Sequence, residues 1–448
     1  MHRRIFAKRI PMRTYCLILF CLLAAAACPA VFAGDSTHYT LRDLCRTAND
    51  NAQTIRIATD EVFIAEQEKK RALSVLIPRA TAFGSHTSHK DTSFTSPDTT
   101  TVGVKLTQSF TINGKELIAY DVTKKGIDKT SFTLEGIRSD YLLQVALTYF
   151  DTLEAKRLLE IADADVQRLD AHKNAVKEKL RVGSVTRTDL YRAEAALSRA
   201  MSDRVMAGSA VIQNKARIVE LTGIADPFVI YDEDITPMEG FEPSLAGIQE
   251  TALENRYEIK AAKKNLEIAD QTISYEKGDY WPTLSLETGY RESDMSYGSS
   301  SLPGGLGGIA ESDAQDTYIQ AELVFTLFDG GLRRAQINQA MARKRQAEQD
   351  LSQTQKNIIL ESTVAFSDYE TARKVLINLA DELKAAQENH KAVQMQYQYG
   401  MADIIDMMDA NTLLVQAERS MSNARYALLQ TMYRILHTQG DLVDHLLD

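Results

Sequence analysis

The sequence contains one unit twice, and this duplication restricts the folds that the chain can adopt. Residues of the first half recur in the second half at one constant spacing: Thr47, Ala48, Asn51, Ile55, Ala58, Ile64, Ala65 and Pro78 match Thr251, Ala252, Asn255, Ile259, Ala262, Ile268, Ala269 and Pro282. A further set, which includes Gly183 and Gly400, recurs at a slightly larger spacing. Such a repeat predicts two copies of one structural unit. We place the first repeat at 34–224, a Pro-, Asp- and Glu-rich linker at 225–244, the second repeat at 245–440 and a C-terminal tail at 441–448.

The spacing of apolar residues predicts the same order of elements in each repeat. An amphipathic helix at 41–77, or at 245–280, ends before a proline, and two strands follow it. A proline-free segment comes next, at 115–182 and at 331–399, and a shorter helix returns after a glycine. As a helix, each long segment would extend about 100 Å, which exceeds the needs of a compact domain. We expect the two shorter helices of a repeat to stack end to end along the long one, with the strands at one end and the glycine turns at the other.

Alternating apolar residues predict the strands. One face carries Val102, Val104, Leu106, Phe110 and Ile112 in the first repeat, and Leu284, Leu286, Ile319, Ala321, Leu323, Phe325 and Leu327 in the second. The loops between the strands, at 93–98 and 296–314, are polar. Four strands with an exposed apolar face are an aggregation hazard in water, whereas a closed membrane barrel turns that face toward lipid. We therefore expect several chains to share one barrel.

The first 33 residues predict an export signal, because basic residues precede an apolar run and Val31-Phe32-Ala33 forms a cleavage site. The segment ending at Cys28 also resembles a lipoprotein cleavage box, so lipidation of Cys28 is an alternative. Cleavage after Ala33 leaves only Cys45, which excludes an intrachain disulfide and a thiolate metal site. No later segment offers 18 consecutive apolar residues, and the net charge of −10 argues against nucleic acid as a partner.

The stretch from Gly400 to Ala410 predicts the turn of a helical hairpin. Gly400 suits the end of one helix, and Asp403 suits the N-cap of the next. Asp406 and Asp409 then lie on one face of the returning helix. Within a single chain they indicate a solvated helix start, where carboxylates suit the helix dipole. The alternative is that several copies meet and their aspartates ring an opening.

These features resemble the TolC-type outer-membrane efflux proteins, also called outer membrane factors. The resemblance extends over the whole mature sequence. It is carried by the signal peptide, the duplicated unit, Asn49 and Asn51, Pro78 and Pro282, the turn Phe328-Asp329-Gly330-Gly331, and the tips Val182-Gly183-Ser184 and Tyr399-Gly400-Met401.

The resemblance implies a mixed α/β membrane protein that assembles as a homotrimer. Four strands from each of three chains would form a shared 12-stranded β-barrel in the outer membrane, and the long helices would form a periplasmic α-barrel, a coiled-coil tunnel. It also implies a passive exit duct of a tripartite efflux or type I secretion system. Its partners would be a periplasmic adaptor (membrane fusion protein) and an inner-membrane RND or ABC transporter.

In this family, aspartate rings close the tunnel at its periplasmic tip, and the matching residues are Asp406 and Asp409. Links from the inner hairpin to the outer one match Tyr397 with Thr188 and Asp189. Gly183 and Gly400 form the tip turns. Ala402 stands where the family has a basic residue.

No pattern in the sequence predicts catalysis, a cofactor or a metal site. The main alternative of another class is a periplasmic coiled-coil adaptor or scaffold without a membrane barrel. The four alternating strands and the polar loop at 296–314 favour the channel. The sequence does not separate drug or metal efflux from protein secretion, because the transporter would select the substrate.

Overall fold

The computed structural model describes residues 37–90, 98–225, 227–231, 240–296 and 311–447. The predicted signal peptide at 1–33 and most of the two predicted strand loops lie outside these residues. The first half contains β1 (Thr37–Tyr39), α2 (Leu41–Asn51), α3 (Gln53–Val75), β2 (Arg79–Thr87), β3 (Asp98–Thr111), α4 (Lys115–Arg181), α5 (Arg187–Thr222) and β4 (Phe228–Ile230). The second half contains α6 (Leu245–Asn255), α7 (Tyr257–Lys277), the short 3₁₀ helix η1 (Gly278–Tyr280), β5 (Thr283–Ser296), β6 (Glu311–Val324), α8 (Leu332–Gln398), α9 (Ile404–Gln439) and α10 (Leu442–Leu447).

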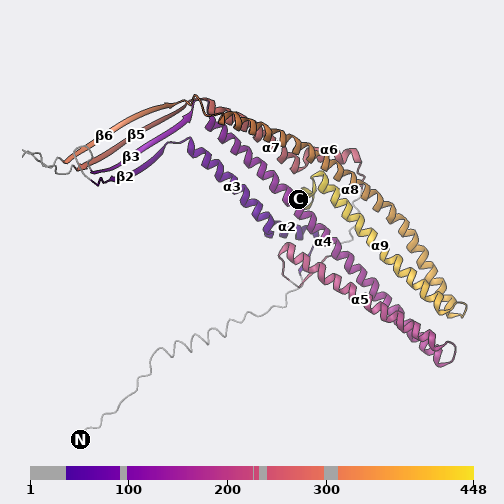
Figure 1. Cartoon of the computed structure of the whole chain (residues 1–448). Coiled ribbons are helices and arrows are strands. Elements are labelled where there is room, and N and C mark those ends of the chain that lie inside the picture. The colour runs from indigo at the N-terminus through magenta and orange to yellow at the C-terminus, as the bar shows by residue number, and fades with distance from the viewer. Residues whose placement is uncertain (1–36, 91–97, 226, 232–239, 297–310, 448) are drawn as a thin grey trace, which may run out of the picture.

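The two long helices have the predicted extent. Helices α4 and α8 contain 67 residues each, and the returning helices α5 and α9 contain 36 residues each. In Figure 1, α3 and α5 lie along different parts of α4, the strands lie beyond one end of the helices, and the two hairpin turns lie at the other end. Each half therefore forms an elongated rod with two strands at one end and a turn at the other.

The predicted helices at 41–77 and 245–280 were wrong in one respect, because each is two helices separated by a break. Ala52 and Arg256 adopt extended ψ angles of 122° and 128° at the breaks. The asparagine before each break turns toward the end of the returning helix of its own half. Asn51 Nδ2 donates to the Thr222 carbonyl at 3.2 Å, and Asn255 Nδ2 donates to Asp441 Oδ1 at 3.2 Å. The breaks thus occur where the first helix pair meets the returning helix, a contact that helical periodicity does not encode.

The four long strands form one antiparallel sheet in the order β2-β3-β5-β6. Directly opposed residues share a face, and the register aligns Phe110, Leu284 and Leu323. This is the predicted apolar face, and in a single chain it is bare: Val104 is 56% exposed and Ile319 is 87% exposed.

The predicted ends of the strands were wrong, and Asp98 and Ser296, predicted as loop residues, belong to β3 and β5. Ile112 lies just past the end of β3, and Phe325 and Leu327 lie past the end of β6. Conversely, residues 311–314 belong to β6 and not to a loop, because β6 pairs with β5 along its whole length, as far as Ser296 opposite Glu311. Only the central part of the predicted loop, 297–310, lies outside the described residues.

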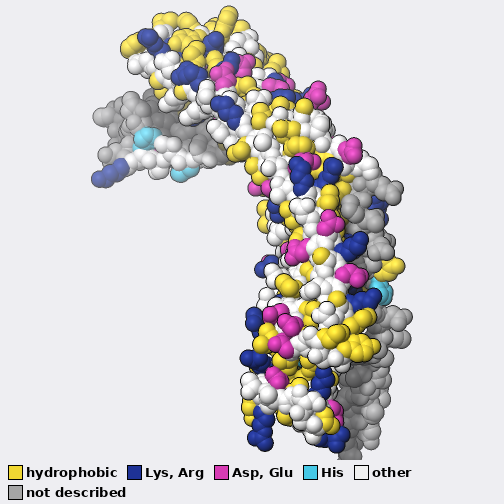
Figure 2. All heavy atoms as spheres, turned by 90° about the vertical axis from the view of Figure 1, so that its right-hand side faces the viewer, with side chains coloured by type: hydrophobic (Ala, Val, Ile, Leu, Met, Phe, Trp, Pro, Cys, Tyr) yellow, Lys and Arg dark blue, Asp and Glu magenta, His cyan; other side chains and the backbone are white. Residues whose placement is uncertain are grey.

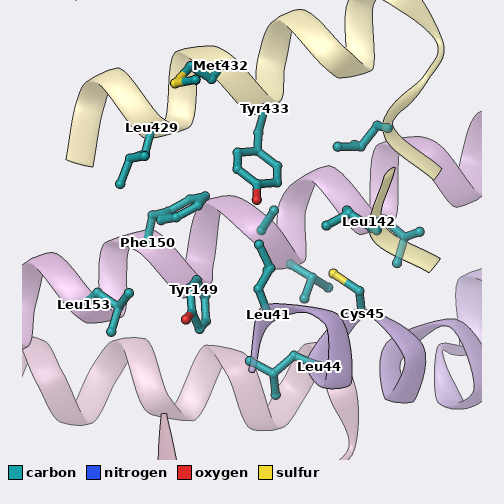
Figure 3. Close-up of a cluster of buried hydrophobic side chains, with 14 of the residues drawn as sticks. Leu41, Leu44, Cys45, Leu142, Tyr149, Phe150, Leu153, Leu429, Met432 and Tyr433 are labelled. Carbon is teal, nitrogen blue, oxygen red and sulfur yellow. The ribbon is translucent and has the colours of Figure 1, made fainter. Parts of the chain in front are cut away.

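The main apolar core lies midway along the helices, where the two halves meet. Figure 3 shows side chains of α4 between those of α2 and α9; they are Leu41, Leu44, Cys45, Leu142, Tyr149, Phe150, Leu153, Leu429, Met432 and Tyr433. The rings of Phe150 and Tyr433 have centroids 5.0 Å apart. Burial of these side chains stabilises the junction by about 1.5–3 kcal/mol for each large apolar group.

The linker and the C-terminal segment also contribute to this core. Within the linker, β4 pairs in parallel with β1, and Phe228 is fully buried. The segment predicted only as a tail forms α10, whose Leu442 and Leu446 are buried. Arg46 of α2 donates to the Leu447 carbonyl at 3.1 Å. Both segments therefore stabilise the core in the middle of the molecule.

None of the helices among the described residues is long and apolar enough to cross a membrane. Figure 2 shows acidic, basic and hydrophobic side chains interspersed along the face of the molecule that it presents.

Candidate gate at the hairpin tips

Both hairpin tips end their long helix with the same backbone turn. Gly183 and Gly400 have φ values of +78° and +75°, in the left-handed region that glycine tolerates. Ser184 N–H donates to the Lys179 carbonyl at 2.9 Å, and Met401 N–H donates to the Gln396 carbonyl at 2.8 Å. These are the hydrogen bonds of a Schellman motif, and they satisfy carbonyls that the helix end leaves open.

The helix that follows each turn begins with a capping box. In α5, Thr186 Oγ1 accepts from Asp189 N–H at 3.3 Å, and Asp189 Oδ2 accepts from Thr186 N–H at 2.8 Å. In α9, Asp403 and Asp406 take the same two positions, with distances of 2.9 and 3.1 Å. The duplicated sequence thus gives two nearly identical tips.

The predicted gate aspartates are both exposed at the start of α9. Within one chain Asp406 belongs to the capping box of α9, which agrees with the interpretation of this stretch as a solvated helix start. Asp409 has no such role, and neither carboxylate forms an ion pair with a described residue. The aspartate ring therefore stays a prediction.

Tyr397, the predicted link residue, does lie against the first hairpin. Its side chain is 8% exposed and packs with Val176 of α4, Ala193 of α5 and Ile404 of α9. Burial raises the pKa of the Tyr397 hydroxyl, and the negative charge of Asp189 raises it further.

The structure does not join Tyr397 to its predicted partners by a hydrogen bond. Its hydroxyl is buried and has no hydrogen-bond partner among the described residues. The Asp189 carboxylate instead accepts from Thr186, and these hydrogen bonds lower the Asp189 pKa. Thr188 is exposed to solvent. The links to Thr188 and Asp189 therefore stay predictions.

A cation that the sequence reasoning missed contacts Tyr397 from the other hairpin. Lys179 Nζ lies 3.8 Å from the centre of the Tyr397 ring and donates to the Tyr397 carbonyl at 3.2 Å. Ala402 carries no charge, and the basic group that contacts Tyr397 comes from α4 of the first hairpin. The only signal in the sequence was the place of Lys179, one turn before Gly183.

A polar seam runs between α4 of the first hairpin and α9 of the second. Asn411 Nδ2 donates to Asp165 Oδ1 at 2.8 Å, and Arg168 pairs with Glu418 at 3.2 Å. Farther from the tip, Gln430 donates to Asp151 at 2.7 Å. This polar seam is therefore held by polar pairs, in contrast to the apolar core midway along the rod.

A groove of about 610 Å³ opens beside this seam, between α5 and α9. Its α5 wall alternates small and basic side chains, including Ala195, Ala196 and Arg199. Arg419, on the α9 wall, pairs with Asp203 at 3.1 Å. Among the described residues there is no cluster of His, Cys, Asp and Glu that could hold a metal ion.

A four-stranded sheet with an apolar outer face, continuous with two long helical hairpins, defines a subunit of an outer-membrane channel with a helical tunnel. The chain belongs to the outer membrane efflux protein family, whose model matches residues 44–224 and 248–439. This confirms the predicted TolC-type family and the outer-membrane location.

Relatives with known names are distant in sequence. The chain is 22% identical to the outer membrane protein TolC of Vibrio cholerae over 326 residues, which cover 72% of this chain and 73% of the relative. It is 22% identical to TolC of Escherichia coli over 384 residues, which cover 84% and 77%.

Solved structures of similar fold include the Campylobacter jejuni CmeC outer membrane channel, with a TM-score of 0.77 at 17% identity over 90% of this chain and 86% of that one. The open state of the Neisseria gonorrhoeae MtrE outer membrane channel gives 0.73 at 19% identity, over 90% and 89%. These likenesses confirm the fold class.

Proposed function

We propose that the chain is one subunit of a passive exit duct of a tripartite efflux or type I secretion system, closed at its periplasmic tip until a partner opens it. The observation that carries this proposal is the placement of a two-faced sheet at one end of a rod and two capped tips at the other. The sheet suits a membrane, and the tips, with their exposed aspartates, suit a constriction.

The chemistry of the two sheet faces supports a water-filled pore. The face opposite the apolar one carries Lys105, whose Nζ lies 3.0 Å from Glu287, and Tyr318, whose hydroxyl donates to Glu287 at 2.7 Å. A polar inner face and an apolar outer face are the pattern of a membrane barrel with an aqueous interior.

The ends of the sheet support a shared barrel. Strands β2 and β6 each pair with only one neighbour within the described chain, so each leaves an open edge. In the proposed homotrimer the β6 edge of one chain pairs with the β2 edge of the next, which removes all open edges. The helical hairpins of three chains then surround one tunnel.

The aspartates support a cation-selective constriction. In the trimer, Asp406 and Asp409 of three chains would crowd six carboxylates at the tip, and rings of carboxylates favour cations in pores. Contacts between the inner and outer hairpins near Tyr397, Thr188 and Asp189 would hold this constriction closed.

The proposed partners are a periplasmic adaptor and an inner-membrane RND or ABC transporter. The groove between α5 and α9 has small residues along its α5 wall, which allow close approach of a partner helix. As a duct, the chain would need no cofactor and catalyse no reaction.

The experiment that tests the proposal is reconstitution of the purified mature protein in a planar lipid bilayer. We expect discrete, cation-selective current steps that divalent cations block from the side of the tips. A silent bilayer, with protein that stays soluble without detergent, would overturn the duct and favour the periplasmic scaffold.

A further inference from the structure

Three side chains form a contact between the hairpins that we name the tip clasp: His172 and Lys179 of α4, and Tyr397 of α8. Lys179 contacts both the ring and the carbonyl of Tyr397, at 3.8 and 3.2 Å. The His172 ring lies against the same tyrosine, with ring centroids 5.3 Å apart. One aromatic residue of the inner hairpin thus sits against two basic residues of the outer hairpin.

Two polar atoms of the tip clasp lack hydrogen-bond partners among the described residues. His172 Nε2 and the Tyr397 hydroxyl are both buried, and neither has a hydrogen-bond partner among the described residues. Buried polar groups without partners weaken a contact, because each has lost its hydrogen bonds to water. The clasp therefore depends on Lys179 and on packing.

No carboxylate of the described residues forms an ion pair with the tip clasp. Helix α5 faces it with Leu190 and Ala193, and α9 faces it with Ile404 and Met407. The carboxylate of Asp189, which acts on Tyr397 through its charge, is held by the cap of α5. Among the described side chains, no carboxylate lies within ion-pair distance of Lys179.

A second positive charge inside this cluster would repel the first. Protonation of His172 places an imidazolium and the Lys179 ammonium in one partly buried site, where no described carboxylate pairs with either of them. Both burial and like charge disfavour that state. Consistent with this, burial lowers the pKa of His172, and the charge of Lys179 lowers it further.

We propose that the tip clasp holds the inner hairpin to the outer one while His172 is neutral, and that protonation of His172 releases it. The proposal rests on the proposed function of the tip as a gate and adds a regulator to it: a fall in periplasmic pH. Release takes the His172 ring into water, which screens its charge from that of Lys179 on the same helix.

The direction of the pH effect follows from linkage. A histidine whose pKa is lower in the closed state than in the open state binds protons more readily when the tip is open. Closure is therefore complete well above the ordinary histidine pKa of about 6.5. It weakens as the pH falls through that value toward the lowered pKa of the closed state.

The test measures single-channel conductance and open probability of the reconstituted protein at about pH 7.5 and about pH 5.5, the range in which an ordinary histidine titrates. For the unchanged protein we expect a several-fold rise in open probability at the lower pH. His172→Gln, which stays neutral, should remove this rise, and His172→Lys should open the tip at both pH values.

Further variants separate the tip clasp from other groups that titrate. An Asp406→Asn, Asp409→Asn background removes the proposed aspartate ring and should keep the response. Lys179→Gln should open the tip at both pH values, whereas Lys177→Gln, at an exposed position of the same helix, should change nothing. Tyr397→Phe keeps the ring and the carbonyl that Lys179 contacts and should therefore keep the pH response.

The outcomes distinguish the two proposals. Currents whose pH response is the same in His172→Gln and in the unchanged protein would overturn the tip clasp as a pH-sensitive latch and leave the duct standing. Absence of channels in the unchanged protein would overturn the duct itself. Migration of each variant as an intact oligomer in mild detergent shows that a lost response is not a failure to assemble.

Discussion

The Asn411 side chain donates a hydrogen bond of 2.8 Å to Asp165, and both residues are buried between the two hairpins. The bond joins α9 to α4 roughly midway between the tip and the apolar core. Asp165 also faces Arg168 at 3.9 Å. This pair is the most buried polar connection of the polar seam between α4 and α9.

We expect Asn411→Ala to loosen the polar seam between α4 and α9, because it leaves the Asp165 carboxylate buried without the hydrogen bond that Asn411 donates. A hydrogen bond to a charged group contributes about 1.5–3 kcal/mol. Raised basal conductance in the bilayer, together with lower thermal stability, would support the expectation. Gln416→Ala is the control, since Gln416 is exposed on the same helix. Equal behaviour of the two variants would argue against a role of the seam in closure.

Removal of the two exposed tip carboxylates, by Asp406→Ala with Asp409→Ala, is expected to raise conductance and weaken block by divalent cations. The physical reason is the loss of six negative charges at the proposed constriction. Because Asp406 also caps α9, Asp403→Ala is the matched control: it removes the cap and keeps both ring carboxylates. Unchanged conductance and cation block in the double variant would contradict the aspartate gate.

His437 gives a prediction with the opposite pH dependence from His172. It lies in the middle of the rod, with Nε2 2.8 Å from Asp140 Oδ1 and Nδ1 3.6 Å from Glu361 Oε1. Burial disfavours its charged form, but hydrogen bonds to Asp140 and Glu361 outweigh burial and raise the His437 pKa. A raised pKa stabilises the fold at pH values below the ordinary histidine value, and this stabilisation is lost as the pH rises through the raised one.

For His437→Gln we therefore expect a loss of thermal stability that is larger near pH 6 than near pH 8.5. The loss should be modest, about 1 kcal/mol, because Asp140 is largely exposed and water screens its charge. Thermal unfolding in detergent across this pH range measures it. A loss that does not vary with pH would show that His437 acts by packing alone.

The two helix-end glycines near the core give a prediction about the duplicated junction. Gly223 ends α5 with φ +70°, and Gly440 ends α9 with φ +86°. A Cβ on Gly440 would lie 3.1 Å from the Asn255 Cβ, whereas a Cβ on Gly223 would lie 3.8 Å from the Asn51 Cβ.

Gly223→Ala should cost about 1–2 kcal/mol of unfolding free energy from the left-handed backbone alone. Gly440→Ala should cost more, because Asn255 must also shift. Chemical or thermal unfolding of both variants compares them directly. A Gly223→Ala variant that is as unstable as Gly440→Ala would contradict the close approach at Asn255 as the cause.

Much of the fold could be predicted from the sequence, because these elements depend on residues that are close together along the chain. Proline-free amphipathic segments predicted α4 and α8, and alternation predicted the two faces of the sheet. Gly183 and Gly400 predicted the turns, because only glycine adopts their backbone readily. Asp403 predicted the start of α9, since its side chain reaches the N–H groups of the same turn.

The breaks at Ala52 and Arg256 could not be predicted in this way. Each break is made by contact with the end of a helix far along the chain, as Asn51 with Thr222 shows. The role of α10 was missed for the same reason. Its short apolar sequence gains stability only from a core that other helices supply.

The sequence by itself determined the duplicated rod, the two-faced sheet and the paired tips, because helical and strand periodicity and turn chemistry act over a few residues. Only the tertiary structure decided which groups meet between the hairpins. It left the Tyr397 hydroxyl without a hydrogen-bond partner among the described residues and placed Lys179 on the Tyr397 ring. It also buried Asn411 against Asp165, two residues that the sequence holds far apart. Such pairs depend on the way in which the long helices cross one another, and a small rotation of either helix would exchange one partner for another.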